Sequence, residues 1–236
     1  MRRLSLLQRI TICASLVVML RLFVQILREY RWYFPGPNFA QSDFLIGRES
    51  RFDAVYSAAF YAHIVASPIA LLLGAFLVFA GSRAKYRNAH RLMGRFQIAL
   101  VLLAVVPSGL VMAGSAYTGP IAGLGFAFQA IAVGGCAVAS VFYAIKGKIS
   151  VHQAWATRCF VLLCSPLLLR LISGVAVTLD LENHDWVYQA NAWFSWVVPL
   201  ACLEFCHLRK RRSDQVLNVH PYLPAVSYTH LPSPRD

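Results

Sequence analysis

The sequence predicts an all-α, polytopic integral membrane bundle of about six transmembrane helices, and three observations support this class. Of the 236 residues, 58% are hydrophobic and only 14% are charged, whereas a soluble domain carries about 25% charged residues. The apolar residues come in runs of about 20 or more, the length of helix that crosses a bilayer. These runs are too long, and alternate too irregularly, for the strands of a membrane barrel. We expect helices, because a membrane span must satisfy its own backbone hydrogen bonds.

Six apolar runs define the expected spans, with ends uncertain by about two to four residues. Their approximate bounds are 8–28, 54–80, 92–115, 121–145, 153–176 and 187–207. The first run follows Met1-Arg2-Arg3 but has no small-residue cleavage signal, so we expect an uncleaved span. All six belong to one transmembrane domain over residues 1–212, with a four-helix core formed by the second to fifth spans.

The segment 213–236 differs in composition and is expected to be an unstructured tail. Its stretch from Leu223 to Asp236 resembles translated sequencing-adapter read-through, so we expect this part not to be native. We assign it no function.

Lysine and arginine indicate how the spans are oriented. They gather at both ends of the chain and after the second and fourth runs: Arg2, Arg3, Arg9, Arg83, Lys85, Arg87, Lys146, Lys148, Arg209, Lys210, Arg211 and Arg212. The other three loops carry no such excess. The positive-inside rule then places both termini in the cytoplasm, and we expect a bacterial inner membrane protein. The net charge of +12 therefore indicates contact with anionic lipids rather than with nucleic acid.

Two histidines at the start of apolar runs are the main candidate site. His90 begins the third span and His152 the fifth, so both are expected at the cytoplasmic face and at similar depth. Two facing imidazoles could ligate a haem iron axially or bind another transition metal. Arg95 and Arg158 would then lie nearby and pair with haem propionates. The alternative is that all four are interfacial basic residues that contact lipid phosphates.

His63 lies well inside the second span, where no loop explains it. It could be a ligand, a proton carrier or a hydrogen-bonding residue between helices. A weak internal repeat lays the second and third spans over the fourth and fifth, aligning His63 with Gln129 and His90 with His152. Gln129 is thus a candidate hydrogen-bond partner for His63.

Known catalytic patterns are missing from the sequence. It contains no Walker, zincin, nucleophile-elbow or Rossmann motif. No catalytic residue is expected, which favours a non-enzyme; with haem, the protein would be a subunit of a membrane oxidoreductase.

The order of these motifs resembles a known family. The residues that carry the resemblance are His63, His90-Arg91-x-x-Gly94-Arg95 and His152-x-x-Trp155-x-x-Arg158. Over about residues 55–175 they resemble the bacterial predicted membrane proteins called domain of unknown function 2306. Membership implies an integral membrane protein without an established activity.

A more distant likeness is to the ascorbate-reducible dihaem transmembrane cytochromes b, which use histidines on four consecutive core helices. That likeness implies that His90 and His152 form one ligand pair and that His63 matches the second-helix ligand. Gln129 stands where the remaining ligand would be. The likeness therefore implies at most one conventional bis-histidine haem.

Three functions remain open from the sequence. The first is electron transfer through one haem b held at the His/Arg cluster, with an unidentified electron donor. The second is a small transporter or permease-like bundle with His63 in a central cavity and an unidentified small-molecule cargo. The third is a non-catalytic protein that interacts with lipids. The sequence gives no oligomeric state.

Overall fold

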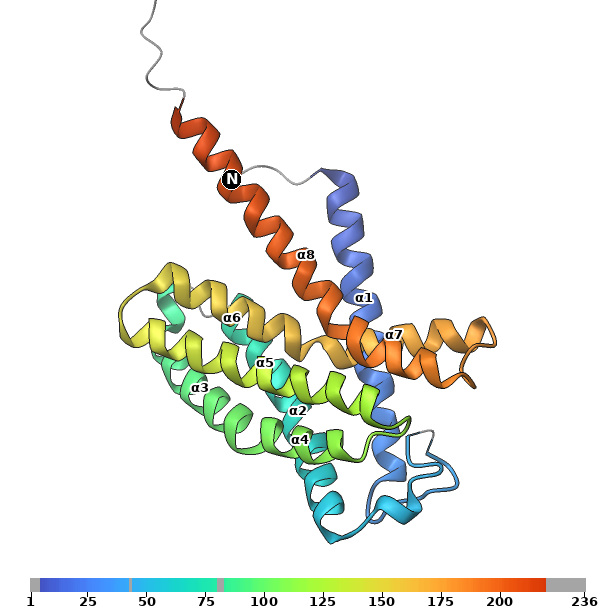
Figure 1. Cartoon of the computed structure of the whole chain (residues 1–236). Coiled ribbons are helices and arrows are strands. Elements are labelled where there is room, and N and C mark those ends of the chain that lie inside the picture. Colours follow the sequence, from blue (N-terminus) through green and yellow to red (C-terminus); the bar gives the residue numbers. More distant parts are fainter. Residues whose placement is uncertain (1–4, 43, 80–82, 220–236) are drawn as a thin grey trace, which may run out of the picture. The chain divides into compact units, whose positions relative to one another are not determined.

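The computed structural model describes residues 5–42, 44–79 and 83–219, and within these residues it contains helices and no strands. The predicted all-α class is thereby confirmed. In chain order the α-helices are α1 (Leu6–Glu29), α2 (Ala54–Phe79), α3 (Arg87–Leu100), α4 (Val106–Gly114), α5 (Pro120–Ile145), α6 (Ile149–Leu163), α7 (Ser165–Thr178) and α8 (Asp185–Val219) (Figure 1).

Short helical turns lie between some of these α-helices. Single 3₁₀ turns occur at Tyr30–Trp32, Glu49–Arg51 and Ala84–Tyr86. A π-helical turn, Val101–Val105, joins α3 to α4, so that these two helices form one span. Cys164 separates α6 from α7, and Pro166 is the second residue of α7, where its missing N–H favours a helix start.

Five stretches of the described chain are long and apolar enough to cross a membrane. They are Leu6–Trp32, Ala54–Phe79, Arg87–Gly114, Pro120–Ile145 and Ile149–Thr178. These stretches correspond to the first five expected spans.

The expected sixth span, 187–207, lies within α8 but is not among these stretches. Polar residues interrupt its apolar run, and their side chains form hydrogen bonds with backbone carbonyls of other segments. The side-chain amide of Gln189 donates to the carbonyl of Thr118 (3.2 Å), and that of Asn191 donates to the carbonyl of Leu169 (3.0 Å).

The chain divides into two compact units, Met1–Leu200 and Ala201–Asp236. Within the described residues, the second unit consists of the carboxyl-terminal part of α8, which continues to Val219. The first residues of the expected tail, 213–219, are therefore helical. The remainder, including the adapter-like stretch, lies outside the described residues.

The second to fifth spans surround a common core. Helix α2 packs against the α3–α4 span and against α6, and α5 packs against α4 and α6. The α3–α4 span and α6 therefore each lie between α2 and α5. This arrangement places the third and fifth spans across the bundle from each other.

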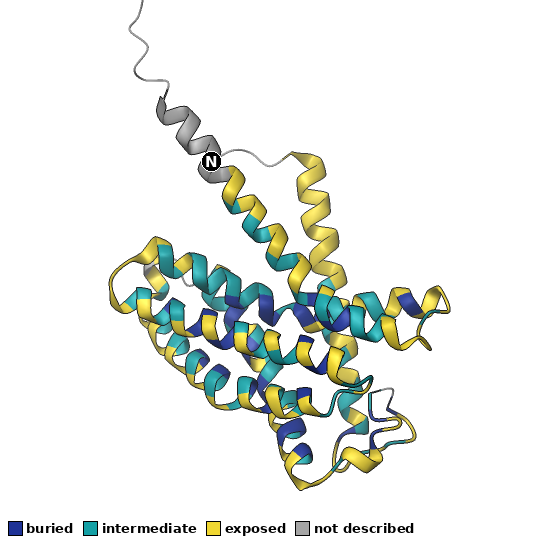
Figure 2. Ribbon diagram, viewed as in Figure 1, coloured by how far each residue is buried: buried dark blue, intermediate teal, exposed yellow. Residues whose placement is uncertain are grey.

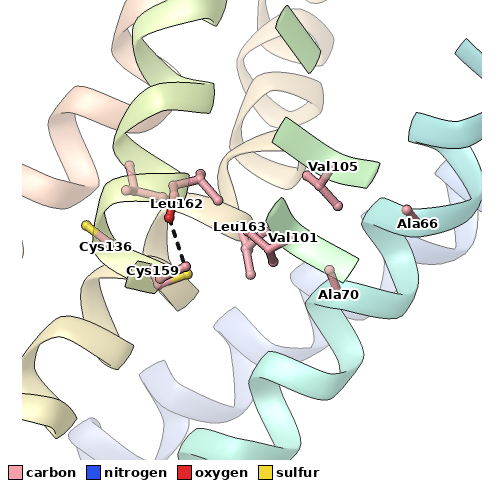
Figure 3. Close-up of a cluster of buried hydrophobic side chains, with 10 residues drawn as sticks. Ala66, Ala70, Val101, Val105, Cys136, Cys159, Leu162 and Leu163 are labelled. Carbon is pink, nitrogen blue, oxygen red and sulfur yellow. Dashed lines mark hydrogen bonds between the residues drawn. The ribbon is translucent and has the colours of Figure 1, made fainter. Parts of the chain in front are cut away.

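Small side chains fill the centre of this core. Ala66 and Ala70 of α2 face Val101 and Val105 of the π turn, and Leu162 of α6 is fully buried beside them (Figure 3). Small residues let membrane helices approach closely, which gains dispersion energy without help from water.

Helix α1 differs from the core helices because none of its residues is buried, and Figure 2 shows it mostly in the exposed colour. Among the other α-helices, it packs mainly against α7. Large exposed aliphatic side chains also occur on the core helices, for example Leu103 and Ile145. In a membrane protein such surfaces are suited to contact with lipid.

The loop before α2 packs onto the start of that helix. Tyr33 and Phe44 contact the buried ring of Phe60, with ring centroids 5.1 Å and 5.6 Å from it. The hydroxyl of Tyr61 donates to the carbonyl of Tyr33 over 2.9 Å. The long loop is thus an ordered aromatic cluster at one end of the bundle, which we call the loop end.

Candidate functional site

The opposite end of the bundle, which we call the basic end, contains the histidine pair. It comprises the carboxyl ends of α2 and α5, the amino ends of α3 and α6, and the basic residues Lys85, Arg87, Lys146 and Lys148. His90 is the fourth residue of α3, and His152 is the fourth residue of α6. The two lie at matching positions on spans that face each other across the bundle.

The two imidazole rings lie close together. Their centroids are 6.2 Å apart and their planes are nearly perpendicular, at 84°. In a site where two imidazoles bind one ion from opposite sides, each metal–nitrogen bond is about 2.0–2.1 Å long, so the ring centroids lie roughly 6 Å apart. The observed spacing suits such a site, and it also suits direct edge-to-face contact between the rings.

Ser140 of α5 fixes the orientation of His152. The Nδ1 atom of His152 lies 2.9 Å from the carbonyl oxygen of Ser140 and 3.0 Å from its Oγ. Because a carbonyl only accepts, this geometry assigns the proton to Nδ1 and leaves the lone pair on Nε2. A backbone carbonyl in this position is the usual outer-shell partner of a metal-binding histidine.

His90 has a different environment. Its Nδ1 atom is buried and makes no hydrogen bond to the described part of the protein. Burying a polar group without a partner costs free energy. One imidazole of the pair is therefore fixed by the protein, and the other has a nitrogen still to be satisfied.

The number of available protein ligands distinguishes between metals. No group of three or more His, Cys, Asp or Glu side chains gathers into a metal-binding cluster within the described residues. Structural and catalytic zinc sites take three or four protein ligands. A haem iron needs only axial ligands from the protein, so a pair of histidines fits haem better than it fits zinc.

The two arginines predicted to accompany the pair are placed differently. Arg95 is exposed on α3, and no contact joins it to either histidine in the described structure. Arg158 of α6 lies over the ring of Trp155, with its guanidinium carbon 5.0 Å from the ring centroid. Their expected role toward propionates stays a prediction.

His63 binds Ser108 rather than Gln129. Its Nδ1 lies 3.0 Å from the Oγ of Ser108, which in turn lies 2.5 Å from the carbonyl oxygen of Ala104. The hydroxyl proton goes to that carbonyl, so His63 donates from Nδ1. The sequence-based pairing of His63 with Gln129 is therefore wrong in this structure.

Gln129 forms its hydrogen bond with a different serine. Its side-chain amide donates to the Oγ of Ser165 at the start of α7. His63 with Ser108 and Gln129 with Ser165 are thus similar polar pairs, and each joins one span of the expected repeat to the next span. Sequence reasoning missed Ser108, Ser140 and Ser165, although serine within an apolar span is itself a signal, because its hydroxyl seeks a partner there.

Comparison with known proteins gives one result. The family model described as predicted membrane protein (DUF2306) matches residues 60–207. No curated protein and no solved structure matches the chain. None of these comparisons shows the more distant likeness to transmembrane cytochromes b. The matched region contains both histidines of the pair, the two polar pairs and most of the described core, and the chain belongs to this family of predicted membrane proteins.

Proposed function

We propose that the protein is a membrane electron-transfer protein that binds one haem b between His90 and His152. The proposal rests on the geometry of the histidine pair. The two rings lie 6.2 Å apart at matching positions on opposed spans, without a third ligand of the His, Cys, Asp or Glu type in the described structure. That ligand set suits an iron whose other four ligands come from a macrocycle.

The residues have distinct roles in this proposal. His152, whose Nδ1 donates to the Ser140 carbonyl, would hold the haem iron through Nε2, and His90 would hold it as well. Arg95 and Arg158 are the cations assigned to the propionates. When bound, haem supplies reversible one-electron chemistry at its iron, and the electron donor is unidentified.

The orientation is also a proposal. The lysines and arginines at the basic end support a cytoplasmic location for that end in a bacterial inner membrane. Both termini then lie in the cytoplasm, provided that α8 crosses the membrane. Lipids contact the exposed apolar faces.

The test is a dithionite-reduced minus oxidised absorption spectrum of the full chain, purified from cells supplied with haem. We expect a b-type α band in the wild type that is lost in His90→Ala and in His152→Ala. His63→Ala is the matched control, because it removes an intramembrane histidine already bound to Ser108, and it should keep the band. A folded wild-type protein without the band, or a band that survives both substitutions, would exclude the proposal.

A further inference from the structure

Gly94 lies one helical turn after His90, on the same side of α3. Four residues turn an α-helix by about 400°, so Gly94 stands about 40° from His90 around the helix axis. Gly94 is partly buried, whereas Arg91 and Arg95 on the outer side of the helix are exposed. Gly94 is therefore on the face of α3 that carries the histidine into the bundle.

The space in front of Gly94 is open. A Cβ built at this position would meet nothing within 4 Å in the described structure. A glycine of the neighbouring helix differs, because a Cβ at Gly74 of α2 would lie 3.1 Å from the ring of Phe160. Protein interiors are densely packed. An inward-facing position without a close neighbour therefore indicates room beside His90.

Gln97 indicates which neighbour the open space faces. Seven residues turn the helix by about 700°, so Gln97 stands about 20° from His90, on the side opposite to Gly94. The side-chain amide of Gln97 donates to the carbonyl of Ala70 of α2 over 3.0 Å. Gly94 is thus on the flank of α3 that is turned away from α2 and toward α5.

The packing of α3 leaves the same side open. In the described structure α3 packs against α2 and has at most slight backbone contact with α5 or α6, whereas the π turn and α4 pack against α5. The rings of His90 and His152 therefore bridge two helices that do not pack directly. Helices in direct contact lie about 8–10 Å apart, which is too close for two imidazoles that bind one metal from opposite sides.

Helix α6 has the same pattern of residues. His152 is followed one turn later by Ala156, which is also small. The residues three and seven positions beyond the small one are buried on both helices; they are Gln97 and Val101 on α3, and Cys159 and Leu163 on α6. On each helix, one small residue thus lies between the histidine and the packed core.

We propose that Gly94 is a specificity-determining residue for haem, because its missing side chain leaves room for an edge of the macrocycle beside His90. The inference rests on the proposed haem site and adds the residue that lets the haem fit. A larger side chain at position 94 would occupy the room that the haem needs. In the haem-free protein the same side chain would enter open space. The substitution therefore acts on haem binding and not on folding.

The test titrates haem into the full chain, purified haem-free in detergent, and compares Gly94→Leu with Gly135→Leu. Gly135 of α5 is the matched control, because it is exposed and a Cβ there also meets nothing within 4 Å. We expect Gly94→Leu to bind haem roughly tenfold to a hundredfold more weakly than the wild type, through overpacking of the site. Gly135→Leu should bind haem as the wild type does. Neither substitution should lower the Tm of the haem-free protein.

Thiol labelling gives a second readout that does not depend on haem affinity. In Gly94→Cys, a small methanethiosulfonate reagent should react at position 94 in the haem-free protein, and saturating haem should abolish that reaction. In Gly135→Cys, the reagent should react at position 135 equally in both states. Mass spectrometry of peptides identifies the modified position, because the chain also has six native cysteines.

The haem site and the role of Gly94 can fail separately. A folded wild-type protein that binds no haem overturns both. A wild-type protein that binds haem, together with Gly94→Leu that binds it equally well, overturns only the role of Gly94. Equal labelling of Gly94→Cys with and without haem has the same meaning. A lowered Tm of haem-free Gly94→Leu would contradict the open space on which the inference depends.

Discussion

The hydroxyl of Tyr30 donates to the carbonyl of Ile64, the group that Pro68 leaves without its helical partner. Proline has no N–H, so the carbonyl four residues before it loses its intrahelical hydrogen bond. An unsatisfied carbonyl costs several kcal/mol where water is absent. The turn that follows α1 therefore stabilises a proline within α2, and it joins the first span to the core.

Tyr30→Phe should destabilise the folded protein by about 1–3 kcal/mol, because it leaves the Ile64 carbonyl unsatisfied. Reversible unfolding in mixed detergent micelles would measure the change. In a Pro68→Ala background the carbonyl regains a helical N–H, so Tyr30→Phe should then cost much less. Equal costs in the two backgrounds would show that the two residues are not coupled.

Gly123 and Gly135 provide a matched pair on α5. A Cβ at Gly123 would lie 2.6 Å from the backbone carbonyl oxygen of Ala113, whereas a Cβ at Gly135 would meet nothing within 4 Å. Gly123→Ala should therefore cost about 1–3 kcal/mol through overpacking between α4 and α5. Gly135→Ala should cost nothing and could gain up to about 1 kcal/mol of helix propensity. The same unfolding assay checks both, and equal effects would contradict the packing described at Gly123.

Ser108→Ala should destabilise the protein by about 1–3 kcal/mol, because it removes the hydroxyl that accepts from the Nδ1 of His63. If the two residues act as a pair, the double substitution with His63→Leu should cost clearly less than the sum of the two single costs. Ser165→Ala should show the same behaviour with Gln129→Leu. Additive costs in both cycles would argue against the polar pairs.

The side of the membrane on which α8 ends can be measured with reporter fusions. A reporter fused after Arg212 should act as a cytoplasmic one, and a reporter placed between Glu182 and His184 as an external one. The physical reason is that the basic residues 209–212 resist transfer across the membrane. If both reporters act as external ones, α8 does not cross the membrane.

The helices were largely predictable because long apolar runs dominate this sequence. The first five expected spans agree with the structure to within a few residues at most ends. His90 and His152, singled out for their positions at the start of two runs, do lie together. Each histidine is the fourth residue of its helix, so the two lie at a similar depth in the bundle. The distance of a residue from the start of an apolar run can be read directly from the sequence.

Side-chain partners were harder to predict, because they depend on how each helix is rotated about its axis. Apolar residues surround these spans on all sides, so the sequence carries little information about rotation. His63 was paired with the wrong residue for this reason. The burial of Arg48 was missed because aromatic contacts between distant parts of the chain, and not its local sequence, fold the loop over it.

The π-helical turn at Val101–Val105 has a consequence for the direction in which the third span presents its side chains. Each residue of an α-helix turns the chain by about 100°, and a π turn holds one residue more than the α-helix needs. His90 and Ser108 stand 18 positions apart, which is about five whole turns, so an uninterrupted helix would align them on one stripe. The extra residue rotates the second half of the span, so that His90 points to His152 while Ser108 points to His63. One extra residue thus lets a single transmembrane segment contact two neighbours that lie in different directions.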